Sequence, residues 1–146
     1  MAPNPDAVGK TYPSVPYAVG REKVREFASA VGEEGRVHHD PDAARDAGYA
    51  DVVAPPMFAV VYSSRALTAA LFDPDVGIDF ALMVHGGQEF EWGPVVVAGD
   101  EIATILSVKD ISSRGPLGFF TFETVSTNQD GHTVCIGTWT NIVRGA

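Results

Sequence analysis

The titratable residues that could carry chemistry gather in residues 33–39, a polar stretch without apolar periodicity. It opens with Glu33 and closes with His38 and His39, just before Asp40. An imidazole changes protonation near neutral pH, so His38 could act as a general base. A histidine that faces solvent in a surface loop is the alternative interpretation, and the sequence leaves both open. Three adjacent residues rarely supply convergent ligands, so we expect no metal at His38, His39 and Asp40.

Two further sites in the sequence carry reactive groups. His85 precedes two glycines in a strand-like run, and it is either a second base or a strand-end histidine with a structural hydrogen bond. The glycines are too few and wrongly spaced for a phosphate-binding loop, and we expect no cofactor. Cys135 is the only cysteine, and its strand-like neighbours predict a small buried apolar residue.

Composition narrows the classes of ligand and the location of the chain. It has 146 residues, ten Lys and Arg against 19 Asp and Glu, and a formal net charge of −9. That balance argues against nucleic acid and anionic membranes, because both need clustered positive charge. Arg21, Lys23 and Arg25 are either a small patch for an acidic carrier protein or solvated helix positions. With no 18-residue apolar run and no signal-peptide pattern, we expect a single cytoplasmic domain over residues 1–146.

The elements that would position these groups come as helices first. Residues 20–31 predict an amphipathic helix with one apolar stripe. A short helix follows from Asp40, a good N-cap, to Gly48, a typical stop. Residues 57–72 are apolar on nearly every side, and Arg65 is their only charge. We therefore expect a helix of about 24 Å that is buried in protein on nearly every face.

Strand-like sequence fills the second half of the chain. Four segments are rich in Val, Ile, Thr, Phe and Trp: residues 82–92, 100–111, 119–126 and 133–143. Their short joins, including a turn at residues 128–131, predict antiparallel neighbours. Helices followed by strands give an α+β pattern, with the sheet wrapped around the long apolar helix. Such a sheet leaves an exposed edge, which a dimer that continues the sheet would cover.

Four segments resemble one known family in their order and spacing. They are residues 20–27 (GREKVREF), 51–56 (DVVAPP), 94–100 (PVVVAGD) and 141–145 (NIVRG). The chain resembles the MaoC-like hydratases and dehydratases, and most closely the small actinobacterial subunits of 3-hydroxyacyl-thioester dehydratases and their uncharacterised relatives. The resemblance covers nearly the whole chain and implies the hotdog fold, with a ligand that is the acyl chain of a thioester on coenzyme A or acyl carrier protein.

The resemblance also implies a catalytic pair. Active members carry an Asp and, five residues later, a His, in the form Asp-x-Asn-x-x-His, and the pair adds water to a trans-2-enoyl thioester or removes it in reverse. In this sequence His38 falls at the histidine, Glu33 replaces the Asp, and Gly35 replaces the Asn. A longer side chain can displace the carboxylate by about 1 Å, which can cost ~100-fold in rate. Glu33 and His38 are therefore the expected catalytic residues, in a weakened form.

The same resemblance predicts where substrate binds. Active relatives carry His-Gly before the buried helix, and a backbone N–H at the helix start stabilises the enolate oxygen. Pro55 and Pro56 stand at the matching positions, and proline has no N–H to donate, so the oxyanion hole is expected to be weakened. The residues expected to bind substrate are Pro55, Pro56, Met57, Phe58, Val61, Tyr62, His85 and Gly86.

Three functions fit these observations. The first is an acyl-thioester-binding subunit with weak catalysis of its own, paired with a catalytic hotdog partner. The second is a self-sufficient homodimeric (R)-specific enoyl-thioester hydratase that uses Glu33 and His38. The third is a non-enzymatic acyl-thioester binding or scaffold protein. The sequence does not distinguish a homodimer from a heterodimer, and whether the lone chain is a lyase stays open.

Overall fold

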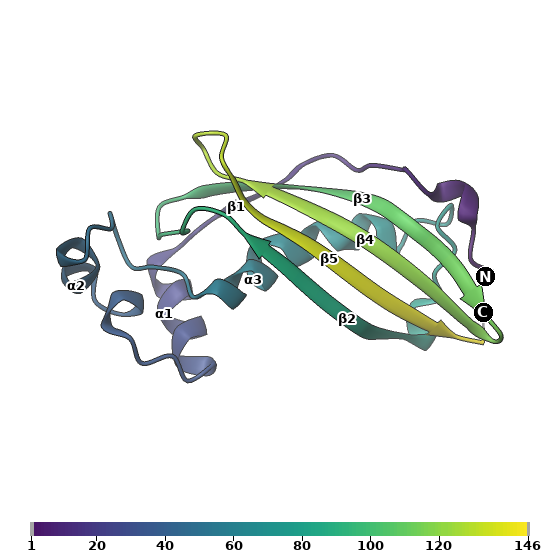
Figure 1. The fold of residues 1–146 in the computed structure, drawn as a ribbon, viewed down its shortest axis with the longest axis horizontal. Coiled ribbons are helices and arrows are strands. Elements are labelled where there is room, and N and C mark those ends of the chain that lie inside the picture. Colours follow the sequence, from purple (N-terminus) through teal and green to yellow (C-terminus); the bar gives the residue numbers. More distant parts are fainter. Residues whose placement is uncertain (1, 146) are drawn as a thin grey trace.

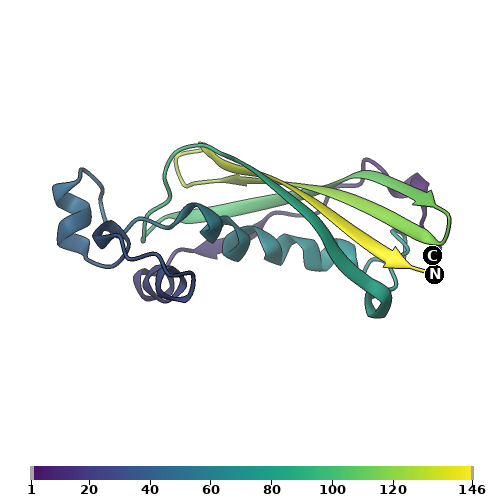
Figure 2. The same cartoon turned by 60° about the horizontal axis from the view of Figure 1, so that its bottom comes forward.

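A computed structural model describes residues 2–145 and shows a five-stranded antiparallel sheet curved around one helical rod (Figure 1, Figure 2). The strand order is β1-β3-β4-β5-β2. The strands are β1 (Val15–Ala18), β2 (Met83–Trp92), β3 (Glu101–Arg114), β4 (Leu117–Thr127) and β5 (Thr133–Arg144). The predicted α+β hotdog arrangement is confirmed. Strand β1 is the one strand that the sequence patterns did not indicate.

The helical segments occupy two places in the molecule. Beyond one end of the sheet lie α1 (Arg21–Ala30), η2 (Arg36–His38) and α2 (Pro41–Asp46) (Figure 1). Along the concave face of the sheet runs the central rod, made of η3 (Pro56–Phe58), α3 (Ala59–Ser63), η4 (Ser64–Ala66) and α4 (Leu67–Leu71) (Figure 2). Short 3₁₀ turns, η1 (Pro5–Ala7) and η5 (Phe80–Leu82), complete the set. The three predicted helices are confirmed to within a few residues.

The central rod is not a uniform α-helix, because a 3₁₀ turn interrupts it at Ser64–Ala66. The Ser63 hydroxyl donates a hydrogen bond to the carbonyl of Ala59 one turn earlier. Such back-bonding offers the backbone oxygen a second donor and is known to bend helices. The polar residues in the middle of an apolar stretch therefore mark the place where the helical geometry changes.

The rod is buried on one side and open on the other. Its buried residues face the sheet: Phe58, Ala59, Tyr62, Ser63, Ala66, Leu67 and Ala70. On the opposite side Met57 is 47% exposed and Phe72 63% exposed, and Arg65 also faces solvent. The expectation of a rod buried on nearly every face is therefore wrong for the isolated chain, because the sheet curves around only one side of it.

Two apolar clusters hold the sheet and the rod together. One lies toward α4 and includes Phe120, Phe122 and Trp139. The other lies toward α1 and surrounds Phe58, whose ring meets Phe27 edge-on with centroids 5.4 Å apart. Cys135 belongs to this second cluster and is buried, as predicted. Within the described residues no helix is both long and apolar enough to cross a membrane.

Candidate functional site

A cavity of about 310 Å³ opens where the rod begins. Its walls come from the segment before the rod, the first turns of the rod, and the segment that follows β2. Two backbone bonds join the two flanking segments: the Ala54 N–H donates to Val96 at 2.9 Å, and the Ala98 N–H donates to Val52 at 3.0 Å. The lining is mainly apolar, and its size lies at the small end of ligand pockets.

His38 lines this cavity and is held in one orientation by the backbone. Its Nδ1 lies 2.6 Å from the carbonyl oxygen of Val53, while the Val53 N–H donates to the Val37 carbonyl at 2.8 Å. A carbonyl oxygen can only accept, so Nδ1 carries a proton, and in the neutral ring Nε2 then keeps its lone pair. That tautomer is the one a general base requires at Nε2.

Glu33 lies beside His38 but outside the cavity lining. Its Oε1 accepts the N–H of Gly35 at 3.1 Å, and its side chain is exposed. A Cβ placed on Gly35 would lie 3.1 Å from His38 Cδ2 and 3.2 Å from Glu33 Oε1. The carboxylate and the imidazole thus flank the same small space, which only glycine leaves open. The structure brings the expected pair together, with the carboxylate engaged by backbone rather than by the ring.

The neighbouring His39 forms a structural hydrogen bond within the loop. Its Nε2 lies 2.7 Å from the backbone carbonyl of Glu33 and so donates to it. This bond ties the two ends of the loop that carries Glu33 and His38. His39 therefore points along the loop instead of joining His38 at a shared ligand.

The two prolines expected at the site line the cavity. Pro56 opens the rod, and its carbonyl accepts the indole N–H of Trp92 at 2.9 Å. The Phe58 N–H donates to the Pro55 carbonyl at 2.8 Å, so it is already occupied. The first N–H of the rod is therefore that of Met57, because neither proline carries one.

Tyr62 forms a deep part of the wall and is only 2% exposed. Burial raises the pKa of its hydroxyl, and the neighbouring Cys135 thiol raises it further. Burial also raises the pKa of Cys135. Both groups therefore stay neutral across the physiological range, and Cys135 has the character of a packing residue rather than a nucleophile.

The other expected substrate-binding residues are not part of the lining of this cavity. Met57 faces solvent, Phe58 is the centre of the aromatic cluster, and Val61 is half-buried on the rod. His85 and Gly86 lie on β2, where His85 meets the Trp139 ring at 6.0 Å and Gly86 forms a bulge. A Cβ on Gly86 would lie 2.6 Å from Ile142 Cδ1, so a larger residue here would require the Ile142 side chain to shift.

Two aromatic residues of the lining were absent from the sequence prediction. Tyr49 stands before the DVVAPP segment, and Trp92 stands at the end of β2 just before Pro94. Both are partly exposed, and they flank the entrance from two segments far apart in the chain. No local sequence pattern marked either residue, because they come together only in the folded chain.

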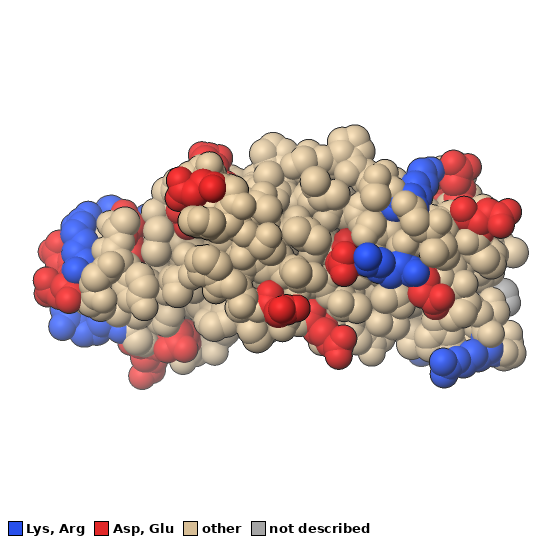
Figure 3. Space-filling view, turned by 45° about the horizontal axis from the view of Figure 1, so that its top comes forward, with Lys and Arg blue, Asp and Glu red and all other residues tan. Residues whose placement is uncertain are grey.

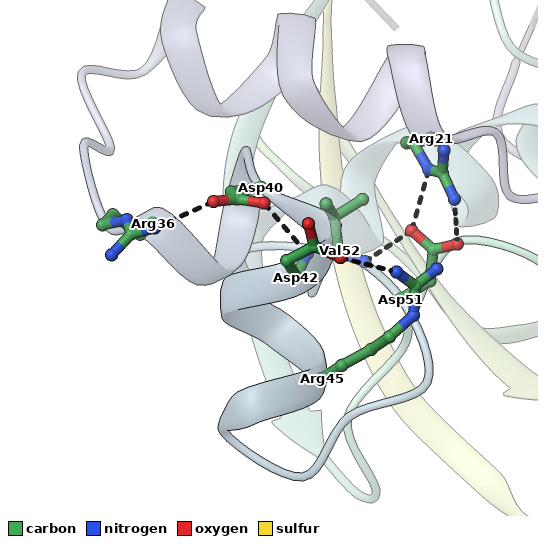
Figure 4. A network of polar contacts seen from close by, with 7 residues as sticks. All are labelled: Arg21, Arg36, Asp40, Asp42, Arg45, Asp51 and Val52. Atoms are coloured by element: carbon green, nitrogen blue, oxygen red, sulfur yellow. Dashed lines mark hydrogen bonds and ion pairs between the residues drawn. The ribbon is translucent and has the colours of Figure 1, made fainter.

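Ion pairs secure the segment that leads into the site (Figure 4). The Arg21 guanidinium donates two hydrogen bonds to the Asp51 carboxylate, at 3.0 and 2.7 Å. Asp51 also accepts the Val52 N–H at 2.7 Å. The side-chain bonds from Arg21 lower the pKa of Asp51. Arg25 pairs with Glu22 at 3.6 Å. Two of the three charges in the candidate basic patch are therefore compensated within the chain itself.

The fold and this site together define the class of the protein. A sheet wrapped around one helical rod is the hotdog architecture, and in this chain a cavity lined in part by His38 opens at the start of the rod. The chain belongs to the family described as "FAS1-like, dehydratase domain region", which matches residues 6–136. The resemblance noted in the sequence is thereby confirmed.

Relatives and solved structures agree with this assignment. A "UPF0336 protein" of Clavibacter michiganensis is 46% identical over 146 residues, which is 99% of this chain and 98% of the relative. A solved "MaoC-like dehydratase" superposes with a TM-score of 0.85 and 32% identity over 96% of this chain, which spans 43% of that protein. The truncated HadBC (3R-hydroxyacyl-ACP dehydratase) complex of Mycobacterium tuberculosis gives 0.80 and 28% identity, covering 94% of this chain and 97% of that one.

Proposed function

We propose that this chain is an acyl-thioester-binding hotdog subunit with weak hydratase chemistry of its own, which works beside a catalytic hotdog partner. The observation that carries the proposal is the cavity at the start of the rod. It has apolar walls and a correctly oriented His38, but its Glu33 carboxylate lies outside and two prolines stand where N–H donors are needed.

The size and lining of the cavity support an acyl chain as the ligand. An apolar cavity of ~150 Å³ accommodates the six carbons of benzene, so a cavity of about 310 Å³ has room for on the order of ten carbons. No Lys or Arg lines it, so a charged head group would stay outside. A medium-length acyl chain with its thioester near His38 satisfies both conditions.

The expected weakness in catalysis follows from the groups around His38. A hydratase needs a carboxylate beside the base and donors for the enolate oxygen. Here Glu33 accepts the Gly35 N–H, and the Met57 N–H is the first donor of the rod. Loss of one oxyanion donor costs ~10²–10³ in kcat in well-studied enzymes, so the lone chain is expected to be slow.

A partner is part of the proposal for two reasons. The structurally similar HadBC is described as a 3R-hydroxyacyl-ACP dehydratase complex. In this chain β2 lies at the edge of the sheet, next to the open side of the rod. We propose that a second hotdog subunit covers this side and supplies an intact Asp and His, and that the thioester is carried on coenzyme A or acyl carrier protein.

The test combines a binding and a turnover assay on the lone chain. Titration with crotonyl- and octanoyl-coenzyme A by calorimetry is expected to show binding, with tighter binding of the longer chain. Hydration of crotonyl- and octenoyl-coenzyme A, followed by loss of the enoyl absorbance, is expected to be barely above the uncatalysed rate. Strong hydration by the lone chain that His38→Ala abolishes would contradict the proposal.

A self-sufficient hydratase is the second candidate, and the free Nε2 of His38 beside Glu33 favours it. It predicts that Glu33→Gln and His38→Ala each lower kcat strongly while circular dichroism and the melting temperature stay unchanged. Equal rates in the native chain and both variants would refute it. Tight thioester binding without turnover in any partner mixture would instead indicate the non-enzymatic binding or scaffold function.

A further inference from the structure

The two edges of the sheet differ in how far the N-terminal segment of the chain covers them. At one edge β1 pairs with β3, and the preceding segment continues along β3 through bonds from the Gly9 and Tyr12 N–H groups to Val108 and Leu106 at 2.8 and 3.0 Å. At the other edge lies β2, ten residues long, and within residues 2–145 no strand pairs with its outer side. A long open edge is a template for pairing with another chain.

Large apolar side chains surround this open edge. They lie on β2, in the turn before it, or on the open side of the rod: Met57, Phe72, Phe80, Leu82, Val84 and Trp92. Exposed apolar residues scattered singly are ordinary, but a concentration beside one edge marks an interaction surface. The β2 edge therefore has the character of an interface rather than of a solvated border.

The outer face of β2 carries uncompensated negative charge. Phe90 points inward, with its ring 5.8 Å from that of Trp139, so Glu89 and Glu91 on either side point outward. Their neighbours across the ladder, Thr138 and Ile136, are neutral, and β2 contains no Lys or Arg. Figure 3 shows acidic side chains without basic ones over this strand.

A second copy of this chain fits such an edge poorly. Two β2 strands related by a two-fold axis would run antiparallel and present the same outer face side by side. The joined face would then carry Glu89 and Glu91 of both copies and no Lys or Arg from either β2 strand. Like charges gathered on one face repel each other over distances up to about the Debye length, roughly 10 Å at 0.1 M salt, and so oppose this pairing.

We infer that Glu89 and Glu91 select the partner at the β2 edge. They oppose pairing with a second copy of this chain and favour a hotdog subunit whose edge strand presents Lys or Arg on its outer face. The inference rests on the proposed function only in requiring a partner at this edge. Main-chain hydrogen bonds between the paired strands would supply affinity, and the two carboxylates would determine which partner binds.

The charge dependence can be measured on this chain without knowing the natural partner. Self-association of the native chain, of E89Q/E91Q, and of the control E22Q/E26Q on α1 is measured by sedimentation at low and high salt. E89Q/E91Q is expected to dimerise on the order of tenfold more tightly than the native chain at low salt, and the difference is expected to shrink as salt screens the charges. The control is expected to behave as the native chain.

A charge-reversed copy, E89K/E91K, serves as the basic partner. Mixed with the native chain in equal amounts, it is expected to form mixed dimers beyond the statistical fraction, as read by native mass spectrometry. A statistical or smaller fraction, or equal self-association of the native chain and E89Q/E91Q, overturns the inference. Octanoyl-coenzyme A binding is measured on the same samples. If the native chain binds octanoyl-coenzyme A but its self-association does not depend on charge, only this inference is refuted. If the native chain does not bind octanoyl-coenzyme A, the proposed function is refuted.

Discussion

Phe58 anchors the start of the central rod, and Phe58→Ala is expected to lower the free energy of unfolding by about 3–5 kcal/mol. The side chain is fully buried at the turn that follows Pro55 and Pro56. Its loss would leave a void between α1, the rod and the sheet. Because Phe58 holds the first turn of the rod in place, the same change is expected to loosen the cavity at that turn.

The size of the effect follows from what the ring contacts. Phe58 meets Phe27 with centroids 5.4 Å apart, and Tyr17 and Tyr62 at 6.2 Å each. Each aromatic pair contributes about 0.5–1.5 kcal/mol beyond the burial of area. Three such partners place Phe58→Ala toward the upper part of the range for phenylalanine truncations. That loss is a large fraction of the ~5–15 kcal/mol that stabilises a typical domain.

Urea unfolding, followed by circular dichroism, measures this change against a matched control. Phe72→Ala removes the same atoms from a side chain that is 63% exposed at the other end of the rod, and it is expected to cost less than about 1 kcal/mol. Equal losses in the two variants, or a loss below about 1.5 kcal/mol for Phe58→Ala, would refute the packing argument.

Three further changes probe the ion pair between Lys10 and Asp73, the cavity entrance, and the loop that carries Glu33 and His38. Bonds from Lys10 lower the pKa of Asp73 to about 2, so this contribution to stability is present above about pH 4 and lost as the pH falls toward 2; melting curves of Asp73→Asn are expected to lack that loss. Trp92→Phe removes the bond to the Pro56 carbonyl and is expected to weaken octanoyl-coenzyme A binding roughly three- to tenfold by calorimetry. Gly35→Ala is expected to move the NMR resonances of the His38 ring, because its Cβ would push against the imidazole and the Glu33 carboxylate; unchanged resonances would contradict that geometry.

Much of the candidate site was predictable because its residues lie close together in the sequence. His38, Pro55 and Pro56 were expected at the site from the family resemblance, and all three line the cavity. Tyr62 was expected from the apolar helix that follows and also lines it. Tyr49 and Trp92 were missed, because they come together only when the segment before the rod packs against the segment after β2.

The orientation of Glu33 and His38 could not be derived from spacing. A separation of five residues places Glu33 and His38 in one loop, but it does not determine which groups they bind. Backbone groups determine these contacts. The Gly35 N–H donates to the Glu33 carboxylate, and the His38 ring donates to the Val53 carbonyl. Val53 lies 15 positions beyond His38, so this contact exists only in the folded chain.

The order of helices and strands, and the apolar rod that the sheet wraps, were determined by the sequence itself. Apolar periodicity and turn residues act over a few neighbouring positions, so they can be read directly from the sequence. The tertiary structure alone decided which side of the rod stays open, which edge of the sheet stays free, and where Glu89 and Glu91 point. These features depend on contacts between distant segments, because burial and exposure are properties of the packed molecule rather than of any local run of residues.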